Sequence, residues 1–213
     1  TGRVCPAVCE GACVLGITES PVAIKNLEFA IADKGFQNGW LKPNIPSFRT
    51  NKSIAIVGSG PAGLAVAQQL NRAGHEITIY EAREKGGGLN EFGIAAYKSI
   101  DNFAQKELDW LLSIGGIKIE YGKEIGSEIN LDQLQSDYDA IFIGMGLSGV
   151  NSLRCEGEDL QNVDDAVSFI SDLRQADSFS NVKGVGRILV GGLRELSVRV
   201  YIDPIKLAAN DLT

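Results

Sequence analysis

A chain of 213 residues with 44% apolar and 22% charged residues is typical of a globular protein, which excludes a disordered or fibrous one. The net charge of -7 and the pI near 4.8 argue against a nucleic-acid-binding surface, which needs clustered Lys and Arg. No apolar run reaches the roughly 18 to 20 residues of a membrane span, and the first residues lack the layout of a signal peptide. We therefore expect a cytoplasmic protein that binds neither nucleic acid nor membrane.

The N-terminal stretch, residues 1–16, is rich in Cys and Gly and has little regular pattern. Cys5, Cys9 and Cys13 follow one another in a C-x3-C-x3-C spacing. In a reducing compartment such a group favours metal or cluster ligation over disulfides. Soft thiolates suit either zinc or iron-sulfur, a structural thiol cluster is the third interpretation, and a fourth ligand is missing.

A helix and a linker follow the cysteines. The apolar spacing predicts a helix from residue 21 to about residue 35, with Ser20 as N-cap and Pro21 at the first helical position. Residues 40–53 contain two prolines and no periodicity. They predict an extended linker between domains.

Residues 54–63, IAIVGSGPAG, carry the chain's most informative motif: a buried strand followed by Gly58, Gly60 and Gly63 at G-x-G-x-x-G spacing. The three glycines allow, in order, a sharp turn off the strand, a close approach of a pyrophosphate and close packing of the next helix. The phosphates would lie at that helix's N-terminus, which favours anions. A second strand ends at Glu81, near the offset at which a carboxylate meets the ribose, although Glu81 could also be a plain polar strand end.

The remaining pattern predicts an α/β fold with a Rossmann-like domain on a parallel sheet. After Glu81 come a glycine-dense loop, a helix over about 100–114, strands at 117–122 and 139–146, and a helix over 164–174. The second of these strands is a continuous apolar run suited to a sheet's interior. GRILVGG predicts the first strand of another dinucleotide unit, for which the last residues supply neither a third glycine nor enough chain.

Several motifs in order resemble one family. GRVCPAVCEGAC, PVAIKNLE, VGSGPAGLAVAQQLNRAGHEITIYEA, GGGLNEFGI, DAIFIGMGL and EGEDL are similar to the flavin-containing electron-input proteins typified by the glutamate synthase small (beta) subunit and the N-terminal part of dihydropyrimidine dehydrogenase. The resemblance covers residues 1 to about 192. It implies an oxidoreductase in which NAD(P)H reduces FAD and electrons pass singly through [4Fe-4S] clusters to a catalytic partner subunit or domain.

The resemblance also implies roles for single residues. Gly58, Gly60, Pro61, Ala62 and Gly63 would hold the FAD pyrophosphate and Glu81 the ribose; Gly87, Gly88 and Leu89 would line the flavin; Lys98 would lie near the phosphates; Gly144 and Gly146 would touch FAD again. Cys5, Cys9 and Cys13 match three cluster ligands, and Glu28 matches a Gln or Glu near the other cluster. For Lys98 a solvated surface position is the alternative. Cys155 and His75 are interpreted as an ordinary thiol and a solvated turn residue.

The family pattern divides the chain into a partial helical Fe-S domain with linker (1–50), an FAD-binding domain (51–183) and the truncated start of an NAD(P)H-binding domain (184–213). Because the chain resembles a truncated member of the family, a second hypothesis is a catalytically inert FAD-binding fragment or interaction domain. A disulfide reductase would need a C-x-x-C next to the flavin, which this sequence lacks. The motifs leave undetermined the catalytic residues, the final substrate and the choice between NADH and NADPH.

Overall fold

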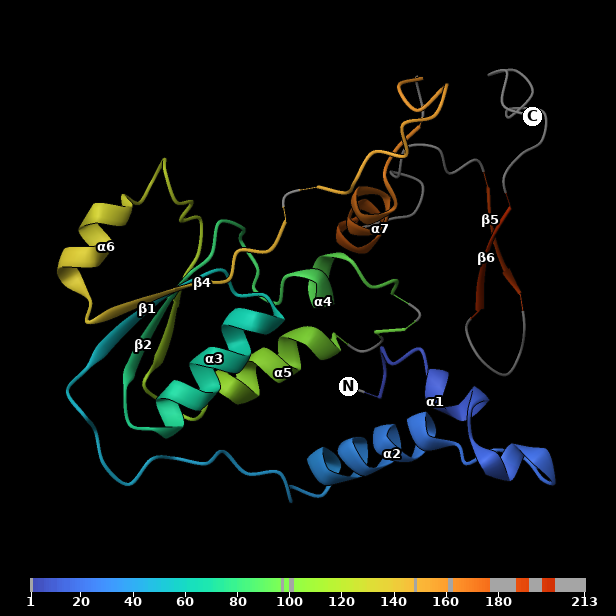
Figure 1. The fold of residues 1–213 in the computed structure, drawn as a ribbon, viewed down its shortest axis with the longest axis horizontal. Helices are drawn as coiled ribbons and strands as arrows, with labels where there is room; N and C mark the ends of the chain where they lie inside the picture. Colours follow the sequence, from blue (N-terminus) through green and yellow to red (C-terminus); the bar gives the residue numbers. More distant parts are fainter. Residues whose placement is uncertain are drawn as a thin grey trace.

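The centre of the molecule is a parallel four-stranded sheet with the strand order β3-β2-β1-β4 (Figure 1). The structure, a computed structural model, describes residues 2–96, 98–99, 102–147, 149–160 and 163–176, together with two strands at 187–191 and 197–201. The sheet strands are β1 (Ser53–Val57), β2 (Glu76–Tyr80), β3 (Ile117–Glu120) and β4 (Ala140–Ile143). This order confirms the expected Rossmann-like α/β fold. The chain adds β2 and β3 on one side of β1 and then crosses to the other side, where β4 lies, so the strand order reverses between β1 and β4.

Two helices cover one face of the sheet. They are α3 (Pro61–Arg72) and α5 (Phe103–Leu112). Because side chains alternate along a strand, every second residue of β1, β2 and β3 points toward these helices. The buried core there consists of Ile54, Ile56, Ala67, Ile77, Ile79, Leu111, Ile114 and Ile117. The helix expected over 100–114 is thus α5, with residues 100 and 101 outside the described part of the chain.

A smaller core lies on the opposite face, where Ala55 and Val57 pack with Ile129 and Leu134. Leu134 belongs to α6 (Leu131–Asp137), a helix that the sequence analysis did not predict. Its signal was Asn130, whose side chain accepts a hydrogen bond from Asp132 N at 2.8 Å as an N-cap.

The prediction that the apolar strand at 139–146 lies inside the sheet is wrong. Among the described strands, β4 pairs with β1 alone and lies at an edge of the sheet, and Ile143 is 54% exposed. An apolar run indicates that a strand is apolar on both faces. It carries no information about whether a further strand lies alongside, because that depends on the order of strands in space.

The N-terminal part is helical, which corrects two expectations. The cysteine stretch forms α1 (Val8–Gly11) and a 3-10 turn, η1 (Val14–Ile17), instead of an irregular loop. The next helix, α2 (Ile24–Gln37), begins after Ala23, so Ser20 and Pro21 lie outside it. The carboxylate of Glu10 accepts a hydrogen bond from Lys25 N at 2.9 Å. A side chain from α1 therefore caps α2, in place of the neighbouring serine.

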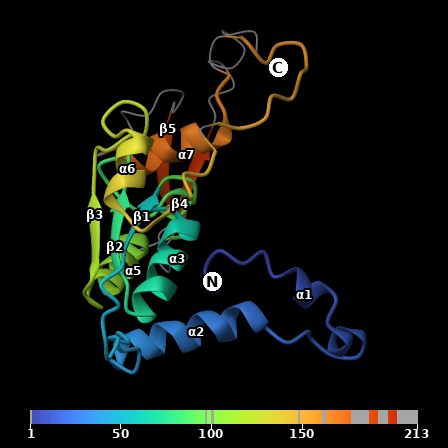
Figure 2. The same cartoon turned by 60° about the vertical axis from the view of Figure 1, so that its left-hand side comes forward.

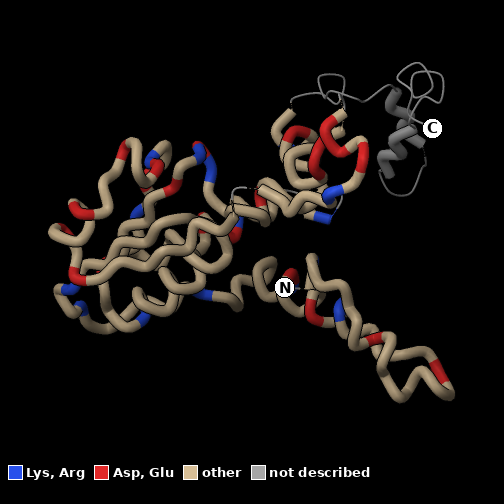
Figure 3. Tube along the Cα trace, turned by 45° about the horizontal axis from the view of Figure 1, so that its top comes forward, with Lys and Arg blue, Asp and Glu red and all other residues tan. Residues whose placement is uncertain are grey.

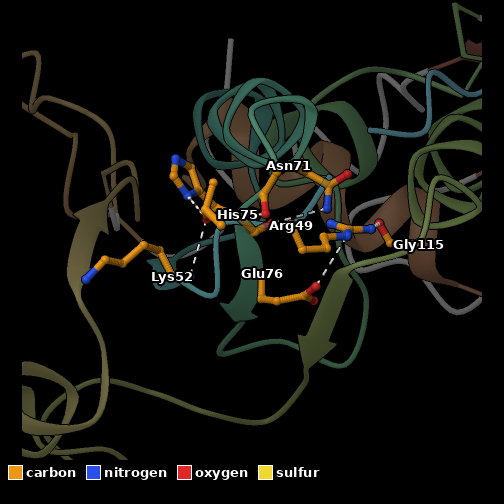
Figure 4. A network of polar contacts seen from close by, with 8 residues as sticks. Arg49, Lys52, Asn71, His75, Glu76 and Gly115 are labelled. Carbon is orange, nitrogen blue, oxygen red and sulfur yellow. Dashed lines mark hydrogen bonds and ion pairs between the residues drawn. The ribbon is translucent and has the colours of Figure 1, made fainter. Parts of the chain in front are cut away.

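The linker expected between the domains has neither helix nor strand over its described residues 39–52, and its end is fastened to the sheet (Figure 4). Arg49 donates from Nη2 to Gly115 O at 3.4 Å, and its Nε lies 3.4 Å from Glu76 Oε1. The fully buried Asn71 of α3 donates to His75 O at 3.4 Å beside it. These contacts fix the chain where it enters β1.

Beyond β4 the chain continues to α7 (Ala166–Gln175), which confirms the helix expected over 164–174. Acidic residues of the preceding segment gather near α7 (Figure 3). GRILVGG supplies the expected strand, β5 (Arg187–Gly191), which pairs antiparallel with β6 (Ser197–Tyr201). The expectations that fall on residues 192–196 and 202–213 lie outside the described residues. In the part of the chain that the structure describes, no helix is long and apolar enough to span a membrane.

Candidate dinucleotide-binding site

The first glycine loop leaves the carboxyl end of β1 at the point where the strand order reverses. Gly58 has φ +96°, and its N–H donates to Tyr80 O at 2.8 Å. A Cβ at this position would lie 2.6 Å from Gly144 O at the end of β4. Gly58 therefore needs both the positive φ and the absence of a side chain, as predicted for a tight turn. Crevices at such reversal points are where α/β sheets bind ligands.

The other two glycines of the motif have different surroundings. A Cβ at Gly63 would lie 1.9 Å from Gly58 O, so glycine there lets α3 pack directly against the loop. A Cβ at Gly60 would approach nothing closer than Gly88 Cα at 3.9 Å. Gly60 also has an extended backbone at the N-cap of α3, with φ -70°. The packing of the protein itself therefore does not require glycine at residue 60, and the neighbouring Pro61 and Ala62 are exposed.

The second glycine loop lies against the first. Gly87 N donates to Ser59 O at 3.0 Å, and a Cβ at Gly88, which has φ +53°, would lie 2.6 Å from Gly60 Cα. Gly88 is followed by α4 (Leu89–Phe92), whose first residue exposes its side chain. The first loop, residues 58–63, and the second loop, residues 86–88, thus lie against each other, and together we call them the cradle.

Glu81 is tied to the same cradle by Ser59, a residue that the sequence analysis passed over. Ser59 donates from N and Oγ to Glu81 Oε2 at 2.9 and 2.5 Å, and Arg83 N donates to Oε1 at 3.0 Å. Ser59 is fully buried and Glu81 is 8% exposed. Ser59 could have been noticed from its place inside the motif, at the position facing the strand end that carries Glu81.

The remaining predicted residues divide into two groups. Gly144 joins the cradle, because its N–H donates to Val57 O at 2.8 Å and its carbonyl faces Gly58. Gly146 has φ +70°, and a Cβ added there would have no atom within 4 Å. Lys98 is exposed in the turn after Ala95, whose carbonyl accepts from Lys98 N at 2.9 Å. The structure brings the glycines and Glu81 together and places Gly146 and Lys98 on the surface.

Helix α7 lies next to α4 (Figure 1), and two side chains without a sequence prediction join the two helices. Arg174 of α7 donates to Ile94 O at 2.8 Å and pairs with Glu91 of α4 at 3.4 Å. The two side chains are 7% and 5% exposed. Gln175 also donates to Glu91, at 3.2 Å. No local pattern could have revealed this pair, because its members lie 83 residues apart.

The predicted cluster ligands are not assembled. Among the described residues, no three His, Cys, Asp or Glu side chains lie together as a metal site. Cys5 accepts a hydrogen bond from Ala7 N at 3.4 Å, and backbone N–H groups, foremost that of Val22, lower the pKa of Cys13. Thiolate character at Cys13 suits a metal ligand. Cys9 and Glu28 are exposed, so the described residues do not form a complete cluster site.

Cys155 and His75 lie outside the cradle. Cys155 is an exposed free thiol. His75 lies at the turn before β2, where its Nδ1 and Thr50 Oγ1 are 2.7 Å apart. This contact ties the turn to the linker.

The cradle and the sheet reversal together define a Rossmann-type dinucleotide-binding protein. The chain belongs to the pyridine nucleotide-disulphide oxidoreductase family, whose model matches residues 52–192. A second model, dihydropyrimidine dehydrogenase domain II with a 4Fe-4S cluster, matches residues 1–40. The family is one of oxidoreductases, and the matches confirm the expected cofactors, FAD, a pyridine nucleotide and a [4Fe-4S] cluster.

Curated relatives confirm the resemblance to glutamate synthase small subunits. The NADPH glutamate synthase small chain of Bacillus subtilis is 42% identical over 90% of this chain, and the NADH glutamate synthase of Saccharomyces cerevisiae is 44% identical over 83%. The chain spans 40% and 8% of these two proteins. Among solved structures, Mycobacterium tuberculosis FprA in complex with NADPH shares the fold, with a TM-score of 0.53 and 24% identity over 57% of this chain and 28% of FprA.

Proposed function

We propose that this chain is the flavin-binding part of an electron-input module that takes electrons from NAD(P)H. It would pass them through FAD and [4Fe-4S] clusters to a catalytic partner subunit or domain of the glutamate synthase or dihydropyrimidine dehydrogenase kind. The observation that carries this proposal is the contact of two glycine loops with each other and with Glu81 at the reversal point of the sheet. The name "small chain" of the bacterial relative supports a partner subunit.

Different residues of the cradle would bind different parts of FAD. The pyrophosphate would lie beside Gly60, where the protein packing does not itself require glycine, at the N-terminus of α3, whose helix dipole favours anions. Glu81, oriented by Ser59, would accept hydrogen bonds from the adenosine ribose. Gly87, Gly88 and Leu89 would line the flavin ring, Gly144 and Gly146 would touch the cofactor again, and Lys98 would reach its phosphates.

When bound, FAD supplies the step from a two-electron hydride donor to one-electron carriers. We also propose the domain division at residues 1–50, 51–183 and 184–213. It is supported by the break between the two family matches at residues 40 and 52, which falls in the linker. The four free cysteines support a reducing, cytoplasmic setting.

A direct test is to denature the purified protein and identify the released chromophore. We expect FAD, because the second glycine loop suits an extended FAD and a plain NAD site does not need it. Recovery of NAD without flavin would contradict the proposal.

A catalytically inert FAD-binding domain is the second candidate, and the scattered cysteine ligands favour it. Consumption of NADPH and NADH with ferricyanide as acceptor separates the two when it is measured on a longer chain that carries the flanking segments of the relatives. Turnover of that longer chain above that of free FAD supports the electron-input module, whereas bound FAD without turnover supports the inert domain. The present residues alone are expected to show no turnover in either case.

A further inference from the structure

Arg3, two residues before the first cysteine, is held between the two halves of the chain. Its guanidinium carbon lies 4.1 Å from the ring centroid of Phe29 on α2 and 4.4 Å from that of Phe103 on α5. Nη2 donates to both carboxylate oxygens of Asp33 at 2.7 and 2.8 Å. The Arg3 side chain is only 14% exposed. One cation is therefore stacked between an aromatic ring of each helix and neutralised by a carboxylate of α2.

The residue before Arg3 fixes the same segment to α2. A Cβ at Gly2 would lie 2.8 Å from Phe29 N and 3.0 Å from Lys25 O. The backbone of the N-terminal segment thus rests directly on α2, and the position of Cys5 follows from that of Arg3.

A second aromatic contact continues the junction between α2 and α5. Phe36 and Trp110 meet edge to face, with centroids 5.9 Å apart, and Trp110 Nε1 donates to Leu41 O at 3.2 Å. Phe36 and Trp110 each lie seven residues after Phe29 and Phe103. Because seven residues span about two turns, α2 and α5 lie side by side in the same direction (Figures 1 and 2).

The opposite side of α5 touches the second glycine loop. Gln105 Nε2 donates to Gly86 O at 2.9 Å, and a Cβ at Gly86 would lie 2.9 Å from Leu108 Cδ2. A continuous set of contacts therefore runs from the cysteine segment through Arg3 and α5 to the loop assigned to the flavin.

We propose that Arg3 is a positioning residue that sets the distance between the cysteine segment and the flavin-binding loops. The inference rests on the proposed function for the presence of FAD at those loops. Electron transfer between carriers depends on their spacing, so an electron-input protein needs a rigid junction here. Arginine suits this position because its planar guanidinium stacks on two rings while it pairs with a carboxylate, which a lysine ammonium does not do.

The test measures that distance directly. A nitroxide is attached to the exposed Cys9 in a chain carrying Cys5→Ser, Cys13→Ser and Cys155→Ser, and the flavin is reduced to its semiquinone. Pulsed EPR then gives the nitroxide-to-flavin distance distribution. We expect one narrow peak in the parent chain. Arg3→Gln, Arg3→Lys and Phe103→Leu are each expected to lose this peak and give a broad distribution, with FAD affinity unchanged.

Lys34→Gln is the matched control, because it removes an exposed cation from α2 away from the junction, and it is expected to keep the narrow peak. Parent-like peaks in Arg3→Gln and Phe103→Leu would overturn the inference. A parent chain without FAD would overturn the proposed function instead. In that case a second nitroxide, attached to Lys106→Cys on α5, replaces the flavin radical. A narrow distribution of nitroxide-to-nitroxide distances that becomes broad in Arg3→Gln supports the role of Arg3, and one that stays narrow overturns it. Arg3→Lys serves where Arg3→Gln fails to fold.

Discussion

Gly58, Gly60 and Gly63 are glycines for different reasons, which only the surroundings of each Cα reveal. At Gly58 and Gly63 an added Cβ would collide with the protein's own backbone, at 2.6 Å from Gly144 O and 1.9 Å from Gly58 O. At Gly60 it would make an ordinary contact at 3.9 Å. Substitutions at Gly58 and Gly63 therefore test folding, whereas substitutions at Gly60 test ligand binding.

Gly60→Val is expected to abolish FAD binding and leave the protein folded, because the new side chain occupies the space assigned to the pyrophosphate. Flavin absorbance of the purified variant and its circular dichroism spectrum measure the two effects. Gly149→Ala, at a position with no atom near the added Cβ, is the control and should retain flavin. Flavin retained in Gly60→Val would show that the loop is not the binding site.

Ser59→Ala is expected to weaken FAD binding by about tenfold or more, since a hydrogen bond to a charged group contributes about 1.5–3 kcal/mol. The Ser59 hydroxyl holds Glu81 Oε2 at 2.5 Å, so its loss frees the carboxylate to rotate. Titration of the apoprotein with FAD gives the affinity, and Ser113→Ala on the surface is the control. An unchanged affinity would mean that the backbone N–H groups of Ser59 and Arg83 orient Glu81 without the hydroxyl.

At the scale of elements, short helices hold the cradle in place. α4 has four residues and follows Gly88 directly, so it depends on partners for its stability. Its Glu91 is paired with Arg174 on α7, and the side chain of Asp165 caps the N-terminus of α7. The second glycine loop is thus held by a helix that starts more than seventy residues later in the sequence.

Replacing one member of the buried Glu91–Arg174 pair is expected to lower the unfolding free energy more than replacing both. Glu91→Gln or Arg174→Gln alone leaves one buried charge without its oppositely charged partner, which costs about 3–5 kcal/mol of unfolding free energy, whereas the double variant should recover most of it. Chemical denaturation of the single and double variants measures the coupling, with FAD affinity as a second readout. Additive losses in the double variant would mean that the two side chains act independently.

α7 is expected to loosen in acid. Asp165 accepts hydrogen bonds from Ser168 Oγ and from the N–H groups of Val167 and Ser168. The bond from the Ser168 side chain contributes most to lowering the pKa of Asp165 below its ordinary value of 3.8. A carboxylate with a lowered pKa stabilises the fold above its ordinary pKa, and this stabilisation is lost as the pH falls through the folded value.

Hydrogen exchange of the α7 amides at about pH 6 and about pH 3 checks this, because these values bracket the ordinary pKa of an aspartate. Protection should decrease in acid, after correction for the intrinsic exchange rates. Asp165→Asn is the matched control, since asparagine also caps helices but does not titrate. An equal acid effect in both proteins would assign the loosening to other groups.

At the scale of the whole molecule, α2 is joined to α5 across a linker with no regular structure. The edge-to-face contact of Phe36 with Trp110 and the hydrogen bond from Trp110 to Leu41 O form one end of this junction. Arg3 forms the other end. Among the described residues, the N-terminal part is therefore held by a few specific side chains, and neither buried core cluster includes a residue of α2.

Trp110→Ala is expected to loosen α2, since aromatic pairs contribute about 0.5–1.5 kcal/mol beyond the area they bury. Faster hydrogen exchange over residues 24–37, at unchanged FAD affinity, is the expected result. Trp40→Ala removes an exposed indole next to the junction and serves as control. Unchanged exchange in Trp110→Ala would mean that the Arg3 end holds the helix alone.

The sequence by itself determined the features that depend on local conformation. The G-x-G-x-x-G turn, the strand that ends at Glu81 and the helices α3, α5 and α7 follow from glycine geometry, apolar periodicity and capping residues, each of which acts within a few residues. The convergence of both glycine loops with Glu81 and Gly144 was implied by the family resemblance, and the fold supplies its physical reason, because parallel strands bring their carboxyl ends to one edge of the sheet.

The tertiary structure decided everything that depends on residues far apart in the chain. Glu10 caps the start of α2, and the strand order places β4 at an edge of the described sheet. Arg174 pairs with Glu91, and Arg3 stacks on Phe103. None of these leaves a periodicity or a spacing in the sequence, because each partner is chosen by how the helices and strands pack. Glycine turns and amphipathic repeats are local consequences of backbone geometry, whereas salt bridges, caps from other helices and sheet edges are properties of the folded arrangement.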